Sequence, residues 1–289
     1  MSRKSKELLT KTHLYIISFL LCICVGFIVR YEYFIPRGPY ILCRTNNDIW
    51  LAGIRNDLVS EQVAMNSFWE KDVTDFFVQN VKSSETIIEI GANIGYYTTL
   101  LSKLVGKNGH VFSYEANDEV YKMAKLSLEF NRLEGNITLK NVAVADHDGS
   151  VEFVSDSING VKFSIINIGE GHIKRGFDLF ATKKVRCVTL DNDLSDLKNV
   201  DWLRMDIEGS EILALSGAKR IIENSPKMKI VMEWDTSMMK KYGNVEQLID
   251  QMHGYGFKFF RIPSGKSASP ITKEELLSSS EPQNVFLTR

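Results

Sequence analysis

Apolar and polar positions divide the chain into a long region, beginning near residue 86, in which predicted strands and helices alternate. Short apolar runs that predict strands lie at Thr86 to Ile90, His110 to Ala116, Ile137 to Val144, Trp202 to Asp206, Lys229 to Trp234, Lys258 to Ile262 and Asn284 to Thr288. Helical periodicity lies between several of them, at Gly95 to Val105, Asp118 to Asn131, Ser210 to Asn224 and Val245 to Tyr255. Such alternation is typical of a parallel sheet covered by helices on both faces. The pattern predicts a doubly wound α/β domain.

The preceding segment predicts a hairpin followed by a helix. Extended runs at Tyr40 to Cys43 and Asp48 to Ile54 flank an Asn46-Asn47 turn, so residues 36–59 are interpreted as a linker with a hairpin. Apolar residues recur at helical spacing from Ser60 to Val81, which predicts a helix against one face of the sheet. One catalytic domain is expected over residues 60–289.

The alternation is interrupted between Val144 and Trp202. A turn at residues 146–149 and strands at Val151 to Val154 and Val185 to Leu190 are expected there. Between the two strands, residues 155–184 are rich in Gly, Asn and Ser and predict an irregular excursion. This excursion is either a substrate lid, with His172 as a low-ranked candidate base, or a surface loop without a role.

The N-terminal segment predicts a membrane anchor. Residues 1–12 are basic, and the run from Leu14 to Val29 is apolar apart from Ser18, so a single transmembrane helix is expected over residues 13–35. No small-x-small pair follows the run, which disfavours a cleaved signal peptide. The basic tail favours a cytoplasmic N-terminus and a domain across the membrane, although Arg30, Arg37 and Arg44 weaken this asymmetry.

Composition excludes some classes of function. The 35 Lys and Arg nearly balance the 36 Asp and Glu, so no strong field favours nucleic acid as a partner. Cys22 and Cys24 lack the spacing of a metal or redox site, and no metal is expected. Cys43 and Cys187 are interpreted as two buried thiols, with a disulfide between them as the alternative.

A glycine-rich turn follows the first predicted sheet strand. The segment reads Glu89-Ile90-Gly91-Ala92-Asn93-Ile94-Gly95, where a dinucleotide fingerprint has glycine in place of Glu89. A carboxylate repels a pyrophosphate but is compatible with the positively charged ammonium and sulfonium groups of S-adenosylmethionine. The motif therefore favours that cofactor over a nicotinamide, which remains the first alternative.

The next predicted strand ends in a second acid. Glu115 follows the glycine turn by some twenty residues, the spacing at which a carboxylate can hold a ribose diol. A third contact, with the adenine, is expected near Ala143 to Asp146. Strand, glycine turn, helix, strand and acid together predict a cofactor site.

The segments EIGANIGYYTTL, YEAND, NVAVAD followed by DGSVEF, and RMDIEGSEILALSGA resemble the FkbM-type methyltransferases over roughly Ser60 to Trp234. The resemblance implies a class I methyltransferase fold, Rossmann-like and seven-stranded, and S-adenosylmethionine-dependent methyl transfer to oxygen on a sugar, glycolipid, polysaccharide or related acceptor. It also implies cofactor contacts from Glu89, Gly91, Ala92, Asn93, Gly95 and Glu115, with Ala143 near the adenine.

The same resemblance directs attention to the acids that end two later strands. Asp206, Glu208 and Glu233 are the candidate catalytic residues, because ligands bind at the carboxyl edge of such sheets. Glu211 is interpreted as compensating the dipole of the helix that follows. A membrane-tethered binding module without catalysis is the remaining alternative.

Overall fold

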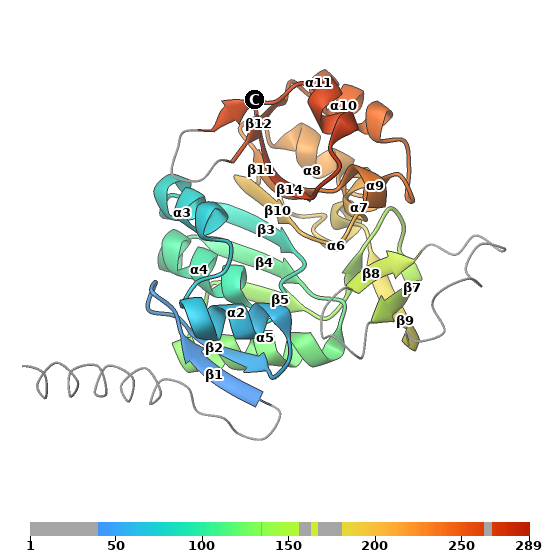
Figure 1. The fold of residues 1–289 in the computed structure, drawn as a ribbon. Coiled ribbons are helices and arrows are strands. Elements are labelled where there is room, and N and C mark those ends of the chain that lie inside the picture. The colour runs from blue at the N-terminus through green and yellow to red at the C-terminus, as the bar shows by residue number, and fades with distance from the viewer. Residues whose placement is uncertain (1–39, 134, 156–162, 167–180, 263–267) are drawn as a thin grey trace, which may run out of the picture.

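The central element of the computed structural model is an eight-stranded sheet (Figure 1). The structure describes residues 40–133, 135–155, 163–166, 181–262 and 268–289. The strand order is β13-β12-β14-β11-β10-β3-β4-β5. These strands are β3 (Thr86–Ile90), β4 (His110–Tyr114), β5 (Ile137–Lys140), β10 (Trp202–Met205), β11 (Lys229–Trp234), β12 (Lys258–Arg261), β13 (Ser269–Pro270) and β14 (Gln283–Thr288).

The sheet is mostly parallel, as the alternating pattern predicts. The five strands from β11 to β5 pair in parallel, while β14 pairs antiparallel with β11 and β12. Six of the seven expected strands are present, and the seventh, Ile137 to Val144, contributes only its first half as β5. The expectation of seven strands in the sheet is wrong by one, because the two-residue β13 extends the edge beyond β12. A strand this short carries no apolar run from which it could be predicted.

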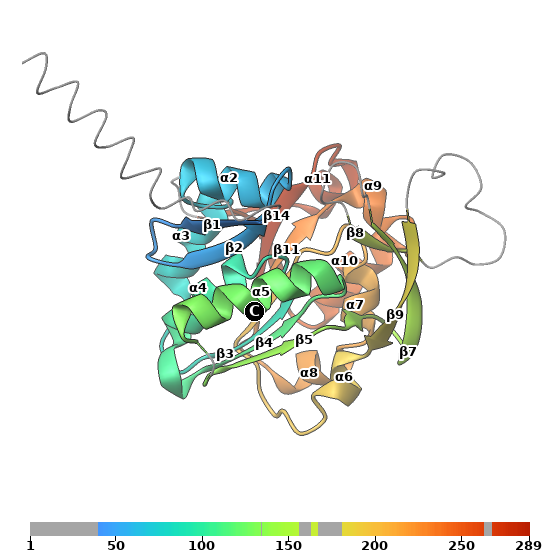
Figure 2. The ribbon, with the colours of Figure 1, turned by 90° about the horizontal axis from the view of Figure 1, so that it is seen from below.

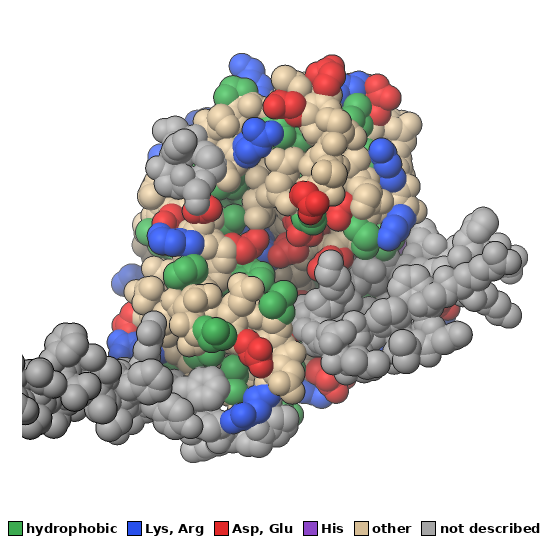
Figure 3. All heavy atoms as spheres, viewed as in Figure 1, with side chains coloured by type: hydrophobic (Ala, Val, Ile, Leu, Met, Phe, Trp, Pro, Cys, Tyr) green, Lys and Arg blue, Asp and Glu red, His purple; other side chains and the backbone are tan. Residues whose placement is uncertain are grey.

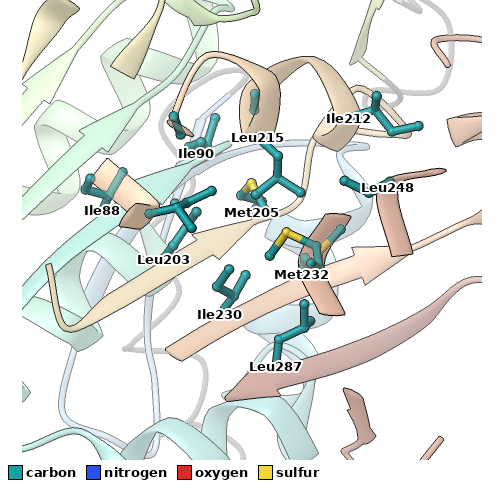
Figure 4. Packing of buried hydrophobic residues seen from close by; sticks show 14 of the residues in the cluster. Ile88, Ile90, Leu203, Met205, Ile212, Leu215, Ile230, Met232, Leu248 and Leu287 are labelled. Atoms are coloured by element: carbon teal, nitrogen blue, oxygen red, sulfur yellow. The ribbon is translucent and has the colours of Figure 1, made fainter. Parts of the chain in front are cut away.

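Helices cover both faces of the sheet (Figures 1 and 2). Strand side chains alternate between the faces: Ile88, Leu203 and Met205 pack in one cluster (Figure 4), while Ile87 and Trp202 pack in the other. The first face receives α7 (Glu211–Ser216), α8 (Lys219–Asn224) and α10 (Val245–Gly254). The second receives α3 (Lys71–Asn80), α4 (Tyr96–Val105) and α5 (Asp118–Asn131). The short elements are η1 (Gly106–Asn108), α6 (Leu190–Asp193), α9 (Thr236–Met239) and α11 (Lys273–Ser278).

Two predicted helices are each divided in the structure. The helix expected over Ser60 to Val81 is α2 (Leu58–Asn66) and α3, because Ser67 and Glu70 both adopt left-handed backbone conformations between them. The helix expected from Ser210 to Asn224 is α7 and α8, separated at Gly217. A Cβ at Gly217 would overlap the carbonyl oxygen of Ala145, so the chain turns where the backbone passes closest to a neighbour.

The predicted hairpin is confirmed. β1 (Tyr40–Arg44) and β2 (Trp50–Ile54) pair antiparallel. Cys43, Ile49 and Leu51 are buried in the same cluster as Leu101 of α4. The hairpin therefore packs into the core of the catalytic domain, which extends the packed unit below residue 60.

A second sheet stands beside the carboxyl edge of the first. It consists of β6 (Ala143–Val144), β7 (Gly149–Ser155), β8 (Phe163–Ile166) and β9 (Ala181–Val188), in the order β6-β9-β7-β8. The single strand expected over Ile137 to Val144 is therefore wrong: it is β5 and β6, which belong to different sheets. The excursion expected at 155–184 contains β8 and the start of β9, while residues 156–162 and 167–180, with His172, lie outside the described residues.

The expectations for the cysteines and for the N-terminal segment have different outcomes. Cys43 and Cys187 are both buried with free thiols, so the disulfide alternative is wrong. The predicted anchor at 13–35 and the tail at 1–12 lie outside the described residues, and the anchor stays a prediction. Among the helices of residues 40–289 that the structure describes, none has the length and apolar character needed to cross a bilayer.

Candidate functional site

A cavity of about 270 Å³ lies at the carboxyl ends of β3, β4, β10 and β11. Acidic side chains gather around this hollow near the centre of the view in Figure 3. The edge where parallel strands end is where ligands bind in open α/β sheets. The residues that line the cavity and are used below are Leu58, Glu70, Gly91, Ala92, Asn93, Tyr97, Glu115, Ala143, Arg204, Asp206, Glu208, Glu233 and Asp235.

The glycine turn after β3 forms one wall. Gly91 and Asn93 have positive φ angles of 84° and 50°, and the backbone N–H groups of Gly91 and Ala92 both donate to the carbonyl of Tyr114. A Cβ at Gly91 would overlap the carbonyl oxygen of Asp206, so only glycine fits between the ends of β3 and β10. Gly95 lies at the start of α4, where a Cβ would stand 3.0 Å from Cα of Ala124, so its glycine serves helix packing.

Glu89 lies behind this wall. Its side chain is fully buried, and its Oε2 accepts hydrogen bonds from Thr98 Oγ1 at 2.5 Å and Ser113 Oγ at 2.7 Å. Its Oε1 lies 3.9 Å from Nη1 of Arg204, the residue paired with it in register on β10. Burial raises the pKa of this carboxyl, and Arg204 opposes the shift. The sequence places Glu89 against the cofactor, whereas the structure places it one layer beneath the lining.

Glu115 joins the glycine turn to the end of β4. Its Oε2 accepts a hydrogen bond from the backbone N–H of Asn93 and its Oε1 accepts one from that of Asn117, both at 2.8 Å. Burial raises its pKa to about 7, and these two bonds oppose the shift. Because a carboxylate oxygen can accept more than one hydrogen bond, Glu115 retains acceptor capacity for a ligand in the cavity. Ala143 lines the same end of the cavity.

Asp206 and Glu233 end neighbouring parallel strands. Each follows directly after a member of the register pair Met205 and Met232, so the two carboxyl groups stand side by side at the sheet edge. Oδ2 of Asp206 accepts a hydrogen bond of 2.8 Å from Nη2 of Arg204. Burial, reinforced by the charge of Asp206, raises the pKa of Glu233 to about 9.

The Asp206-Ile207-Glu208-Gly209-Ser210-Glu211 segment forms a tight turn. Glu208 has a positive φ of 55° and lines the cavity. A Cβ at Gly209, where φ is 94°, would stand 2.6 Å from Cβ of Met238. Glu211 is fully buried, and its Oε1 accepts a hydrogen bond of 2.9 Å from the backbone N–H of Ile207. Glu211 thus closes the turn that presents Asp206 and Glu208.

Arg204 is a site residue that the sequence analysis missed. Its guanidinium donates from Nη1 to the carbonyl oxygen of Gly91 at 2.8 Å and from Nη2 to Asp206, and its Cζ lies 4.5 Å from the ring centroid of Tyr97. Among the described residues that line the cavity, it is the only Lys or Arg. A charged residue inside the buried strand sequence WLRM is a signal that could have revealed it, because buried charges require partners.

Glu70 is a second residue that the sequence analysis missed. It precedes α3 with a left-handed backbone (φ 38°), and its side chain makes no capping bond to that helix. Instead Oε1 accepts from Nδ2 of Asn284 at 2.8 Å, and Oε2 accepts from the hydroxyl of Tyr97 at 3.1 Å. No motif includes Glu70, so its place in the cavity wall is a result of tertiary packing alone.

The charges of the lining agree with a cationic ligand. Six acidic residues, Glu70, Glu115, Asp206, Glu208, Glu233 and Asp235, line the cavity together with a single guanidinium. No group of His, Cys, Asp and Glu within the described part of the chain is arranged to hold a metal ion. Because opposite charges attract strongly in a partly buried site, the residues present fit the sulfonium and ammonium of S-adenosylmethionine.

Comparisons with known proteins show the family of the chain. Residues 89–259 match the model of the methyltransferase FkbM domain. A protein-L-isoaspartate O-methyltransferase of Methanothrix thermoacetophila is 30% identical over 74 residues, which cover 26% of this chain and 32% of that protein. A ubiquinone/menaquinone biosynthesis C-methyltransferase of Klebsiella pneumoniae is 23% identical over 66% of this chain and 64% of its own length. The chain thus spans about a third of the first relative and somewhat under two thirds of the second.

Solved structures give a more distant likeness. An S-adenosylmethionine-dependent O-methyltransferase from Thermotoga maritima has a TM-score of 0.42 at 17% identity, covering 88% of this chain and 78% of that one. A methyltransferase of the same dependence from Aquifex aeolicus has a TM-score of 0.40 at 14% identity, covering 75% and 87%. The family match covers more than half of the chain and overturns the nicotinamide alternative, so the chain belongs to the S-adenosylmethionine-dependent FkbM methyltransferase family.

Proposed function

We propose that this protein transfers the methyl group of S-adenosylmethionine to a hydroxyl oxygen of a sugar, glycolipid, polysaccharide or related acceptor. The observation that carries the proposal is the pair of carboxyl groups, Asp206 and Glu233, side by side at the carboxyl edge of the sheet. A hydroxyl is a weak nucleophile, so a carboxylate that accepts its proton assists the transfer by roughly 10²- to 10⁴-fold. Bound S-adenosylmethionine supplies the activated methyl group.

The two acids take different roles in this proposal. The charge of Asp206 is balanced by Arg204, which fixes the direction of its carboxylate and suits it to orient the acceptor hydroxyl. Glu233 has a raised pKa, so its deprotonated form is the stronger base. A positive charge bound beside it would lower that pKa toward neutrality. Glu233 is therefore the proposed proton acceptor, and Glu208 lies on the same wall as a further acid.

The cofactor contacts are proposed for the opposite end of the cavity. The glycine turn at Gly91, Ala92 and Asn93 would receive the methionine portion, Glu115 the ribose hydroxyls and Ala143 the adenine. Glu89 would act from beneath the turn through its negative charge, and Gly95 by allowing α4 to begin close to α5.

The proposed location is a membrane, through a single N-terminal span over residues 13–35. The support is the apolar run from Leu14 to Val29 and its basic flank. The basic N-terminal tail favours a domain on the side of the membrane away from the cytosol, whereas S-adenosylmethionine is made in the cytosol. Protease protection of the domain in sealed membranes measures the side directly.

A transfer assay tests the proposed chemistry. The protein is incubated with methyl-labelled S-adenosylmethionine and, separately, glycolipid, polysaccharide and protein fractions. We expect label in a carbohydrate-containing fraction as an alkali-stable ether, and a loss of roughly 10²-fold or more for Glu233→Gln. Glu223→Gln, which removes an exposed carboxylate from α8, is the matched control and should not change the rate. Label confined to protein would contradict the proposal, and cofactor binding without transfer to any fraction would favour the non-catalytic binding module.

A further inference from the structure

Large hydrophobic side chains that the structure leaves exposed are concentrated around the β1–β2 hairpin. Six such side chains occur among the described residues, and Val78 on α3 is the one remote from the hairpin. The other five lie on β1 itself or on α2 and α5, the helices that contact the hairpin: Tyr40, Leu58, Met65, Leu126 and Phe130. Scattered single apolar residues need no explanation, but five on three adjoining elements mark a candidate interaction surface.

Helix α2 presents two large apolar side chains outward. Leu58 and Met65 are seven residues apart, two helical turns, and therefore point to the same side, with exposed fractions of 54% and 72%. The opposite side of α2 carries Val59 and Val63, which are buried against the domain. The exposed residues Glu61 and Gln62 lie between Leu58 and Met65 on the outward side, so that side carries a large apolar side chain at each end and polar side chains in between.

The same helix borders the cavity. Leu58 and Val59 belong to the cavity lining together with Asp206 and Glu233. Figure 1 shows α2 in front of the sheet, beside the hairpin and below the strand ends. Whatever covers the outward face of α2 therefore lies next to the cavity.

The length of chain between the apolar run and the hairpin limits what can cover this face. Ten residues, 30–39, separate Val29 from Tyr40, and five of them follow the aromatic flank that ends at Phe34. Five residues span at most about 18 Å when fully extended. A domain of about 250 residues has a radius of gyration near 18 Å, so it is at least about twice as wide as this tether is long. With the proposed anchor in a bilayer, the side of the domain opposite the hairpin therefore cannot reach the membrane.

We propose that the outward face of α2, with Tyr40 of β1, rests on the lipid surface and holds the mouth of the cavity at the level of the lipid head groups. This proposal depends on the membrane anchor proposed above, though not on the identity of the acceptor. Helix α2 contains no Lys or Arg and carries the acidic Glu61, so burial of Leu58 and Met65 in the interface, rather than attraction to anionic lipid, supplies the contact.

Fluorescent labelling of the full chain in phosphatidylcholine vesicles tests the contact. Cys22 and Cys24 are replaced by Ala, the buried Cys43 and Cys187 remain, and a single cysteine carrying an environment-sensitive dye is placed by Leu58→Cys, Met65→Cys or Val78→Cys. We expect a blue shift and quenching by brominated lipid at positions 58 and 65, unchanged in high salt, and neither at position 78. Val78 is the matched control because it is also an exposed apolar residue on a helix.

The outcomes separate the proposals. Equal quenching at 58, 65 and 78, or quenching at none of them while the protein still sediments with the vesicles, overturns the docking face and leaves the anchor intact. A full chain that does not associate with vesicles overturns both the anchor and the face. Neither result bears on methyl transfer, which the labelled-methyl assay measures independently.

Discussion

Nη1 of Arg204 donates a hydrogen bond of 2.8 Å to the carbonyl oxygen of Gly91, which ties the end of β10 to the glycine turn after β3. The same guanidinium holds Asp206, stacks on Tyr97 and lies near Glu89. One side chain therefore joins the turn proposed to hold the cofactor to the carboxyl group proposed to orient the acceptor. Changes at Arg204 should affect both together.

Replacing Arg204 should destabilise the fold and weaken cofactor binding. Arg204→Met leaves the buried carboxyl of Glu89 without its cation, and breaking a buried ion pair typically costs on the order of 3–5 kcal/mol. Arg204→Lys keeps the charge but loses the forked geometry, so its loss of stability should be smaller while its loss of S-adenosylmethionine affinity persists. Urea unfolding and calorimetry measure the two effects. Equal stability of Arg204→Met and the wild type would contradict this account.

Gly91 should not accept any side chain. Gly91→Ala forces a left-handed alanine, at about 1–2 kcal/mol, and places its Cβ against the carbonyl of Asp206. We expect a large loss of both stability and cofactor binding. Gly254→Ala is the control, because nothing lies within 4 Å of a Cβ there and the residue ends α10. That change should be neutral or stabilising by up to about 1 kcal/mol. Similar behaviour of the two variants in thermal unfolding would argue against the close approach at Gly91.

Stability should fall as pH rises from about 5 to about 9. Burial raises the pKa of Glu211 to about 8 and that of Glu233 to about 9, from an ordinary value of 4.5. Between those values the folded state binds more protons than the unfolded state, so the free energy of unfolding decreases with pH. Urea unfolding at a series of pH values measures the slope, and Glu233→Gln should flatten its alkaline part. A stability that is constant or rises over this range would exclude such raised pKa values.

Glu70 should affect catalysis more than cofactor binding. Its carboxylate is held by Tyr97 and Asn284 beside the two candidate catalytic acids. Glu70→Gln is expected to lower the rate of methyl transfer and to leave the affinity for S-adenosylmethionine within a few-fold. Asp75→Asn, which changes a half-exposed carboxylate on α3, is the control and should match the wild type in both measurements. A rate unchanged by Glu70→Gln would show that Glu70 does not contribute to methyl transfer.

The central sheet was predictable because its strands are fully buried and nearly continuously apolar. Runs such as Thr86 to Ile90 and Lys229 to Trp234 have no solvent-facing side, so apolar length alone identifies them. The points at which an apolar run divides into two strands were harder to predict. Ile137 to Val144 is one apolar run by composition, yet it divides because β6 pairs with β9, more than forty residues later in the chain. Pairing of that kind has no local signal.

The site residues that belong to sequence motifs were predictable, whereas those placed by contacts with distant residues were not. The glycine turn, Glu115, Asp206 and Glu233 all occur at strand ends, and the structure brings them to one cavity. The alternation of strand faces, however, buries Glu89 on the side of Arg204, which no spacing of residues revealed. Glu70 lines the cavity and is held there by Asn284, and both residues come from segments outside the family match, so only the packed structure connects them to the site.

Titration of the protein with S-adenosylmethionine, measured by calorimetry for the wild type and for Glu115→Ala, tests the central claim most directly. The account predicts that the wild type binds the cofactor. It also predicts that Glu115→Ala weakens binding by about 10- to 100-fold, since hydrogen bonds to a charged group are worth about 1.5–3 kcal/mol. Glu129→Ala, an exposed position on α5, should bind as the wild type does. Equal affinity of Glu115→Ala and the wild type, or no binding by a folded wild type at millimolar cofactor, would contradict the placement of the methyl donor in this cavity.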